Sequence, residues 1–141
     1  MHEVTVRHNF ETAHRLPHLE GKCKSLHGHS WWCEVTVSAP RLSAGGVLVE
    51  FGLLKAGIRS WIDTHLDHGT MLGPDDPLVP LLQAEGCKVQ LVAPWPTVED
   101  VAVMIAKEGQ RVLEELVRAP DAVVTRCVVR ETHVNEAAWI R

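Results

Sequence analysis

The sequence lacks several features that would assign it to a large class of proteins. It has no surplus of basic residues, because 14 Lys and Arg stand against 18 Asp and Glu and give a net charge of −4. Binding to nucleic acid through phosphate contacts is therefore not expected. No apolar run approaches the roughly 18 residues that a membrane span requires. The first residues alternate and include an acid, unlike a secretion signal, so we expect a cytoplasmic protein.

Disulfides are not expected either, and one aromatic residue type is missing. The four cysteines are Cys23, Cys33, Cys87 and Cys127, which without a secretion signal we expect to be reduced thiols. Tyrosine is absent, whereas there are nine histidines. Histidine binds metals and transfers protons near neutral pH. The positions of the histidines are therefore the first place to look for a functional site.

The hydrophobic pattern indicates a single α+β domain over residues 1–141. Alternation of apolar and polar residues predicts strands, and apolar residues at helical spacing predict amphipathic helices. Strands and helices do not alternate strictly, which favours an antiparallel sheet with helices on one face over a doubly wound parallel sheet. Residues 66–86 are expected to be irregular. The expected strands are 3–14, 29–38, 89–92, 123–131 and 137–141, and the expected helices are 51–64 and 97–118.

Three histidines are expected to meet if the first two strands pair. His14 lies on the apolar face of the first strand, and His27 and His29 are two residues apart in phase with the apolar face of the second. Three neutral imidazoles with an open fourth position are a catalytic zinc arrangement. The alternative is three hydrogen-bonded core histidines. His8 shares the face but lies about 20 Å along the strand, so we leave it out of the site.

Cys23 is a candidate catalytic thiol. It lies between Lys22 and Lys24 and four residues before His27. Two adjacent cations favour the thiolate, which is the nucleophilic and basic form. The alternatives are a loop cysteine without a role and a fourth zinc ligand, which would make the site structural.

Three acidic or imidazole side chains at element ends are further candidates. Asp67 and His68 follow the first helix, where a carboxylate can orient an imidazole, although adjacent residues do not naturally hydrogen-bond in this way. The alternative is a polar helix end. Glu131 ends a core strand, where a carboxylate can bind the edge of an amidine-like heterocycle through two hydrogen bonds. It could equally pair with an arginine such as Arg130.

Five sequence blocks in this order resemble one family. The match is to the 6-pyruvoyl-tetrahydropterin synthase family, which includes 6-carboxytetrahydropterin synthase, and it extends over residues 4–139. The Cys-x3-His-Gly-His block with the upstream Ala-His-Arg is the most specific part. The blocks are Phe10–Leu16, Cys23–His29, Leu66–His68, Pro96–Glu99 and Val129–Thr132.

The resemblance implies a fold and an assembly. The fold is the tunnelling fold, in which a four-stranded antiparallel sheet carries two helices on one side. Subunits of the family join their sheets into a barrel of trimers, often stacked as a hexamer. We therefore expect a homo-oligomer, a trimer or a hexamer.

The resemblance also implies roles for the candidate residues. Zinc is held by the three histidines, Cys23 is the general base or proton shuttle, and Asp67 with His68 are its partners from a neighbouring subunit. Glu131 anchors the 2-amino group and ring N–H of a pterin. Thr97 helps it from a helix start, although a simple helix cap remains the alternative reading of Thr97.

The implied substrate is 7,8-dihydroneopterin triphosphate. The short spacing from Cys23 to His27 resembles the bacterial 6-carboxytetrahydropterin synthases of queuosine and other 7-deazapurine pathways, which release acetaldehyde and triphosphate. The alternatives are 6-pyruvoyl-tetrahydropterin synthase, a member that makes a folate precursor, and a non-catalytic zinc or pterin-binding protein. Lys22, Lys24 and Arg15 are candidates for triphosphate contacts.

The chain departs from the family pattern at three places. Glu50 replaces a more frequent aspartate before the first helix, which we interpret as a change of cap. Trp139 stands where a tyrosine is common. The connection 69–95 is long and carries Cys87 and Trp95, so it could reshape the mouth of the site.

Overall fold

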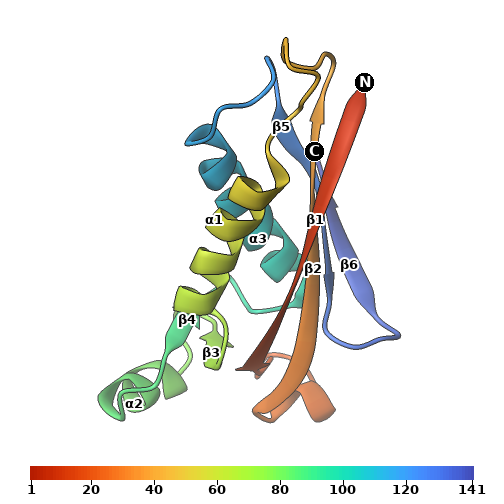
Figure 1. Cartoon of the computed structure of the whole chain (residues 1–141). Helices are drawn as coiled ribbons and strands as arrows, with labels where there is room; N and C mark the ends of the chain where they lie inside the picture. Colours follow the sequence, from red (N-terminus) through yellow and green to blue (C-terminus); the bar gives the residue numbers. More distant parts are fainter.

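A computed structural model describes residues 1–141 as one curled six-stranded sheet with helices packed against it (Figure 1). The strand order is β4-β3-β1-β2-β5-β6. The strands are β1 (His2–His14), β2 (His27–Ala39), β3 (Gly69–Leu72), β4 (Val89–Leu91), β5 (Val123–Arg130) and β6 (Glu136–Ile140). The helices are α1 (Phe51–His65), α2 (Leu78–Ala84) and α3 (Val98–Glu114), with a 3-10 turn, η1 (Lys22–Lys24), before β2.

The centre of the sheet is the antiparallel pair of β1 and β2, each 13 residues long. Their register runs from His2 opposite Ala39 to His14 opposite His27. Even-numbered residues of β1 from Val6 to His14 are buried, as the alternation in the sequence predicted. Strands β5 and β6 extend the sheet antiparallel on the β2 side.

The prediction of a four-stranded, purely antiparallel sheet with two helices is wrong. The connection expected to be irregular contains β3 and α2, and β3 pairs in parallel with β1 and with β4. Strand β3 has four residues and α2 has seven, so neither is long enough to show a hydrophobic period. The sheet is therefore mixed, and the fold is α+β with three helices.

Helices α1 and α3 cover the same face of the sheet (Figure 1). They cross closely at Gly57, where an added Cβ would lie 2.4 Å from Cγ1 of Val112. The Glu50 carboxylate accepts hydrogen bonds from the amides of Gly52 and Leu53, so its interpretation as a helix cap is confirmed. None of the helices is long and apolar enough to span a membrane.

The other face of the sheet carries a chain of ion pairs across four strands. Glu34 Oε1 lies 3.2 Å from Nε of Arg7 and 2.6 Å from Nη1 of Arg130, and Arg130 Nε lies 2.7 Å from Oε2 of Glu136. The hydrogen bond from Arg130 lowers the pKa of the Glu34 carboxyl. Arg130 forms its ion pairs with Glu34 and Glu136, and not with the adjacent Glu131.

His8 makes the stability of the fold depend on pH. Its side chain is buried, its Nε2 has no hydrogen-bond partner, and burial lowers its pKa to about 4. Arg59 and Lys55 reinforce this shift and Asp63 opposes it. The folded pKa lies below the ordinary value of 6.5, so the contribution of His8 is present above pH 6.5 and is lost as the pH falls towards 4.

We therefore expect a His8→Leu variant to lose less stability on acidification than the wild type. Between pH 7 and pH 5 the difference should be about 2 kcal/mol in the free energy of unfolding. Urea unfolding of both proteins at the two pH values measures it. Equal losses in both proteins would show that His8 is not the buried neutral group that the structure describes.

Candidate metal centre and active site

Three imidazoles converge at one end of the β1–β2 pair. His14 comes from β1, and His27 and His29 come from β2, where the register places them opposite His14 and Thr12. Their potential ligand nitrogens all lie within 4.8 Å of one another. The structure thus brings together the three histidines that the strand pairing predicted.

Backbone carbonyl groups orient two of the imidazoles. His14 Nδ1 lies 2.8 Å from the carbonyl oxygen of Pro96, and His27 Nδ1 lies 2.6 Å from that of Ser25. A carbonyl oxygen only accepts hydrogen bonds, so each Nδ1 carries the proton and each Nε2 keeps its lone pair. The Nε2 atoms are therefore the ones available to a metal ion.

The buried nitrogens fit a metal ion. Nε2 of His14 and Nε2 of His29 are buried without a hydrogen-bond partner, a state that costs free energy unless another group binds there. Burial lowers the pKa of His14 to about 4 and also lowers that of His29, against the opposing effect of Glu131. Burial thus favours the neutral form of these two imidazoles, which is the form that binds first-row transition metals.

Glu131 faces these histidines from the turn after β5. Its Oε2 lies 3.6 Å from Nε2 of His14 and 3.8 Å from Nε2 of His29. The sequence placed Glu131 at a strand end but gave no sign that it lies beside the imidazoles. This proximity depends on β5 ending next to β2, a pairing between residues about 100 positions apart.

A cavity of about 350 Å³ brings Cys23, Thr97 and Glu131 together. Cys23 is exposed within η1 and lies outside the cluster of potential metal ligands, which comprises the three histidines alone. Cys23 is therefore not among the side chains that could hold a metal ion in this arrangement. The other lining residues are Leu16, Leu19, Val98, Glu99, Asn135, Glu136 and Ala137.

Thr97 is a helix cap as well as a cavity residue. Its hydroxyl accepts from the amide of Asp100 and donates to Oδ2 of the same residue, at 3.2 Å in each case. The predicted cap at the start of α3 is therefore confirmed. The hydroxyl keeps one acceptor lone pair for another partner.

Asp67 and His68 form a hydrogen-bonded pair, contrary to the expectation that adjacent residues would not. Nδ1 of His68 lies 2.8 Å from Oδ2 of Asp67. His68 has a φ of 59°, in the left-handed region, which turns the chain sharply between α1 and β3. The amide of Glu11 donates to Oδ1 of Asp67, and this bond is the main reason why the pKa of Asp67 is low.

This pair does not reach the cavity of its own chain. The His68 imidazole is 79% exposed and does not line the cavity that contains Cys23. Glu11, to which the pair is anchored, is exposed on the face of β1 opposite to the buried His14. The His68 imidazole therefore points to solvent, and neither it nor Asp67 lines the cavity that contains Cys23 of the same chain.

Arg15 is paired with a buried carboxylate. Its guanidinium donates to both carboxylate oxygens of Asp76, which is fully buried and also accepts from the amide of Leu78, the first residue of α2. This pairing lowers the pKa of Asp76. Lys22 and Lys24 are exposed beside Cys23 and keep their charges available. Nothing in the sequence marked Asp76 as a buried acid.

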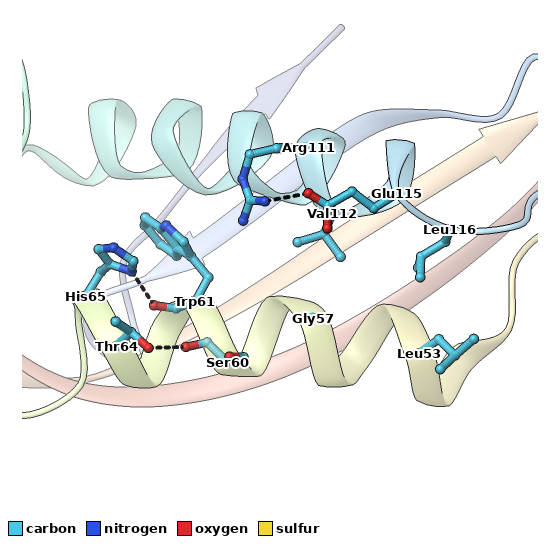
Figure 2. Close-up of a pocket in the computed structure, with 10 residues that line it drawn as sticks. All are labelled: Leu53, Gly57, Ser60, Trp61, Thr64, His65, Arg111, Val112, Glu115 and Leu116. Carbon is cyan, nitrogen blue, oxygen red and sulfur yellow. Dashed lines mark hydrogen bonds and ion pairs between the residues drawn. The ribbon is translucent and has the colours of Figure 1, made fainter.

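A second hollow lies on the outer side of the helices and contains none of the candidate residues. Figure 2 shows this groove of about 320 Å³ between α1 and α3, with the Trp61 and His65 side chains at one end. Its one arginine, Arg111, is held by Glu108 and Glu115 at 2.8 and 3.0 Å. The groove therefore lies apart from the three histidines, and it contains none of the candidate catalytic or ligand residues.

Replacing His14 should abolish metal binding. A His14→Ala variant removes one of three ligands, so its metal affinity should fall by more than the roughly 10- to 100-fold typical of changes around the ligands. Metal content after equilibrium dialysis, measured by atomic emission, checks this. His65→Ala, which changes a histidine in the groove between the helices, is the control. A folded His14→Ala protein that binds metal as the wild type does would contradict the assignment.

Comparison with known proteins identifies relatives of this chain. The family model described as 6-pyruvoyl tetrahydropterin synthase matches residues 3–141. A 6-carboxy-5,6,7,8-tetrahydropterin synthase of Rickettsia typhi is 32% identical over 110 residues, which are 77% of this chain and 80% of that protein. The enzyme of the same name from Synechocystis is 47% identical over 64 residues, which are 43% of this chain and 50% of that one.

A solved structure has the same fold. A 6-pyruvoyltetrahydropterin synthase of Plasmodium vivax superposes with a TM-score of 0.74 at 18% identity, and the match covers 99% of this chain and 97% of that one. At this identity the likeness establishes the fold alone. The match of the family model over almost the whole chain establishes the lineage: this chain belongs to the 6-pyruvoyl tetrahydropterin synthase family.

Proposed function

We propose that the protein is a zinc-dependent lyase, a 6-carboxy-5,6,7,8-tetrahydropterin synthase. With one molecule of water, it converts 7,8-dihydroneopterin triphosphate to 6-carboxy-5,6,7,8-tetrahydropterin and releases acetaldehyde and triphosphate. The observation that carries the proposal is the set of three histidines, two of which have a buried, unpartnered Nε2, beside a cavity that contains Cys23 and Glu131. The names of the relatives support this branch of the family, whose product would serve the synthesis of queuosine and other 7-deazapurines.

His14, His27 and His29 would hold the zinc ion. Three neutral nitrogen ligands with a free fourth position are typical of catalytic zinc. When bound, the ion would act as a Lewis acid toward the side-chain oxygens of the substrate and make the adjacent C–H bonds more acidic. The Pro96 and Ser25 carbonyl groups would keep two of the rings in the required tautomer.

Cys23 is the proposed base. Its thiolate would take a proton from the substrate side chain, and the thiol is exposed in η1 at the cavity. Asp67 would orient His68, which returns protons. Because His68 faces solvent in its own chain, we propose that it serves Cys23 of a neighbouring subunit.

Glu131 and Thr97 are proposed to bind the pterin ring. A carboxylate can accept two hydrogen bonds from the 2-amino group and the neighbouring ring N–H. Glu131 lies at the boundary between the three histidines and the cavity, so a ring bound there would present its side chain to the metal centre. Thr97 would contribute through the lone pair that its helix cap leaves free.

A homo-oligomer, a trimer or a hexamer with joined sheets, would complete the site. Two observations support this. The Asp67–His68 pair is directed outward, and β4 and β6 are edge strands that a second chain can extend. All four cysteines are free thiols, which fits the reducing cytoplasm that we propose as the location.

The reaction itself tests the proposal. The zinc-loaded protein is incubated with 7,8-dihydroneopterin triphosphate, and the products are identified by mass spectrometry. We expect 6-carboxytetrahydropterin together with acetaldehyde. 6-Pyruvoyl-tetrahydropterin would assign the protein to the branch that only eliminates triphosphate. No consumption by the zinc-loaded protein would identify a binding protein instead of an enzyme.

The shared site predicts complementation between two inactive variants. Cys23→Ala and His68→Ala should each lower turnover by about 10²- to 10⁴-fold, because each removes a proton-transfer group. Both should keep their zinc, and Cys87→Ala, another exposed cysteine, should remain fully active. In mixed oligomers formed by co-expression, about a quarter of the sites would combine an intact Cys23 with an intact His68.

Activity of the tandem-tagged mixed species measures this complementation. Turnover well above that of either parent is the expected result. Mixed species as inactive as their parents would mean that Cys23 and His68 act within one chain. Loss of zinc from Cys23→Ala would mean that Cys23 is a ligand and that the centre is structural.

A further inference from the structure

The loop that carries Cys23 has few contacts with the rest of the molecule. Residues 18–26 are all exposed. The backbone hydrogen bonds of the loop are internal, from Leu16 to Cys23 at 2.7 Å and from Leu19 to Leu16 at 3.1 Å, with two more inside the turn. The loop contacts the rest of the molecule through the buried side chain of Leu16, through the Ser25 carbonyl that accepts from Nδ1 of His27, and through a ring stack between His18 and Trp95. The position of Cys23 therefore depends on very few interactions.

The stack between His18 and Trp95 is close and nearly parallel. The ring centroids are 4.4 Å apart and the planes differ by 16°. The indole is itself fixed, because a Cβ added at Gly73 would lie 2.7 Å from Cε3 of Trp95. The amide of Thr97 donates to the Trp95 carbonyl at 2.8 Å. Because Thr97 is the cap of α3, this bond connects Trp95 to the start of that helix. The Cys23 loop therefore packs against an indole that is itself held by its neighbours.

The same segment also holds a metal-centre histidine. Pro96, the next residue, provides the carbonyl oxygen that accepts from Nδ1 of His14 at 2.8 Å. The tripeptide Trp95–Thr97 therefore touches the Cys23 loop through its first residue and His14 through its second. It ends with Thr97, which lines the cavity beside Cys23 and Glu131.

We propose that Trp95 and His18 are positioning residues, whose stack fixes the Cys23 loop relative to His14. This inference rests on the proposed role of Cys23 in catalysis. The long connection 69–95 would then have a function in this chain, because it ends with Trp95, whose indole holds the loop. A displacement of about 1 Å of a reacting group can lower a rate by about 100-fold, so a small loosening of the loop would be visible in turnover.

The two residues differ in what they hold, and this difference gives a sharp test. His18→Ala removes the loop side of the stack only. It should lower kcat by about tenfold or more with KM changed by less than about threefold, and leave the metal affinity as in the wild type. Trp95→Ala also removes the support of Pro96, so its metal affinity should fall as well, by about tenfold.

Amide hydrogen exchange of the zinc-loaded protein supplies a readout that does not depend on turnover. Exchange in residues 16–25 should be faster in both alanine variants, while exchange in β1 and β2 should be unchanged. His18→Phe and Trp95→Phe keep a stacked ring and should restore slow exchange and most of kcat. If the wild-type protein proves inactive on the pterin substrate, the exchange measurement still tests whether the stack holds the loop.

The molecule provides a matched control. Trp61 and His65 form another tryptophan–histidine stack, with centroids 5.0 Å apart, inside α1 and beside the groove between the helices (Figure 2). His65→Ala should change neither the exchange of residues 16–25 nor kcat nor metal content. Equal effects of His65→Ala and His18→Ala would show a general loss of stability and overturn the proposal.

Three other results would overturn it. Wild-type exchange of residues 16–25 in His18→Ala would show that the stack does not hold the loop. Faster exchange with unchanged kcat in that variant would show that the position of the loop does not limit the reaction. Failure of His18→Phe to recover kcat would show that the imidazole acts by its chemistry and not by stacking.

Discussion

The pairing of β1 with β2 is the constraint on which the rest of the structure depends. It lays 13 residues against 13, buries one side of each strand under the helices, and sets His14 opposite His27. A slip of one residue would turn every side chain of one strand to the opposite face. The burial of Phe10, Trp31 and Val35 therefore also fixes the cluster of three histidines, because the same register determines the core and the cluster.

The parts of the fold that could be predicted from the sequence are those formed by long periodic segments. Both long strands, α1, α3 and the convergence of the three histidines follow from alternation and helical spacing. The four residues of β3 and the seven of α2 were missed because their formation depends on neighbours that are distant in the chain. The same limit applies to Asp76, whose burial depends on Arg15, and to Glu131, whose place beside His14 depends on the end of β5.

The two faces of the sheet carry different kinds of side chain. One face is an apolar core under α1 and α3 that ends at the histidines. The other carries charged pairs from Arg7 to Glu136 and the outward-facing Glu11, which anchors Asp67. The candidate proton-transfer pair thus lies outside the cavity that contains Cys23 in the same chain. The proposed homo-oligomer would bring these groups together.

Neutral backbone carbonyl groups, and not carboxylates, orient His14 and His27. A carboxylate partner would make an imidazole a stronger donor and would spread negative charge toward a bound ion. With carbonyl partners, a metal ion held by these rings would keep more of its positive charge and would be a stronger electrophile. These acceptors also belong to the main chain, so no exchange of a side chain at Ser25 or Pro96 removes them. Evolution could therefore vary both positions while the electronic character of the centre stays the same.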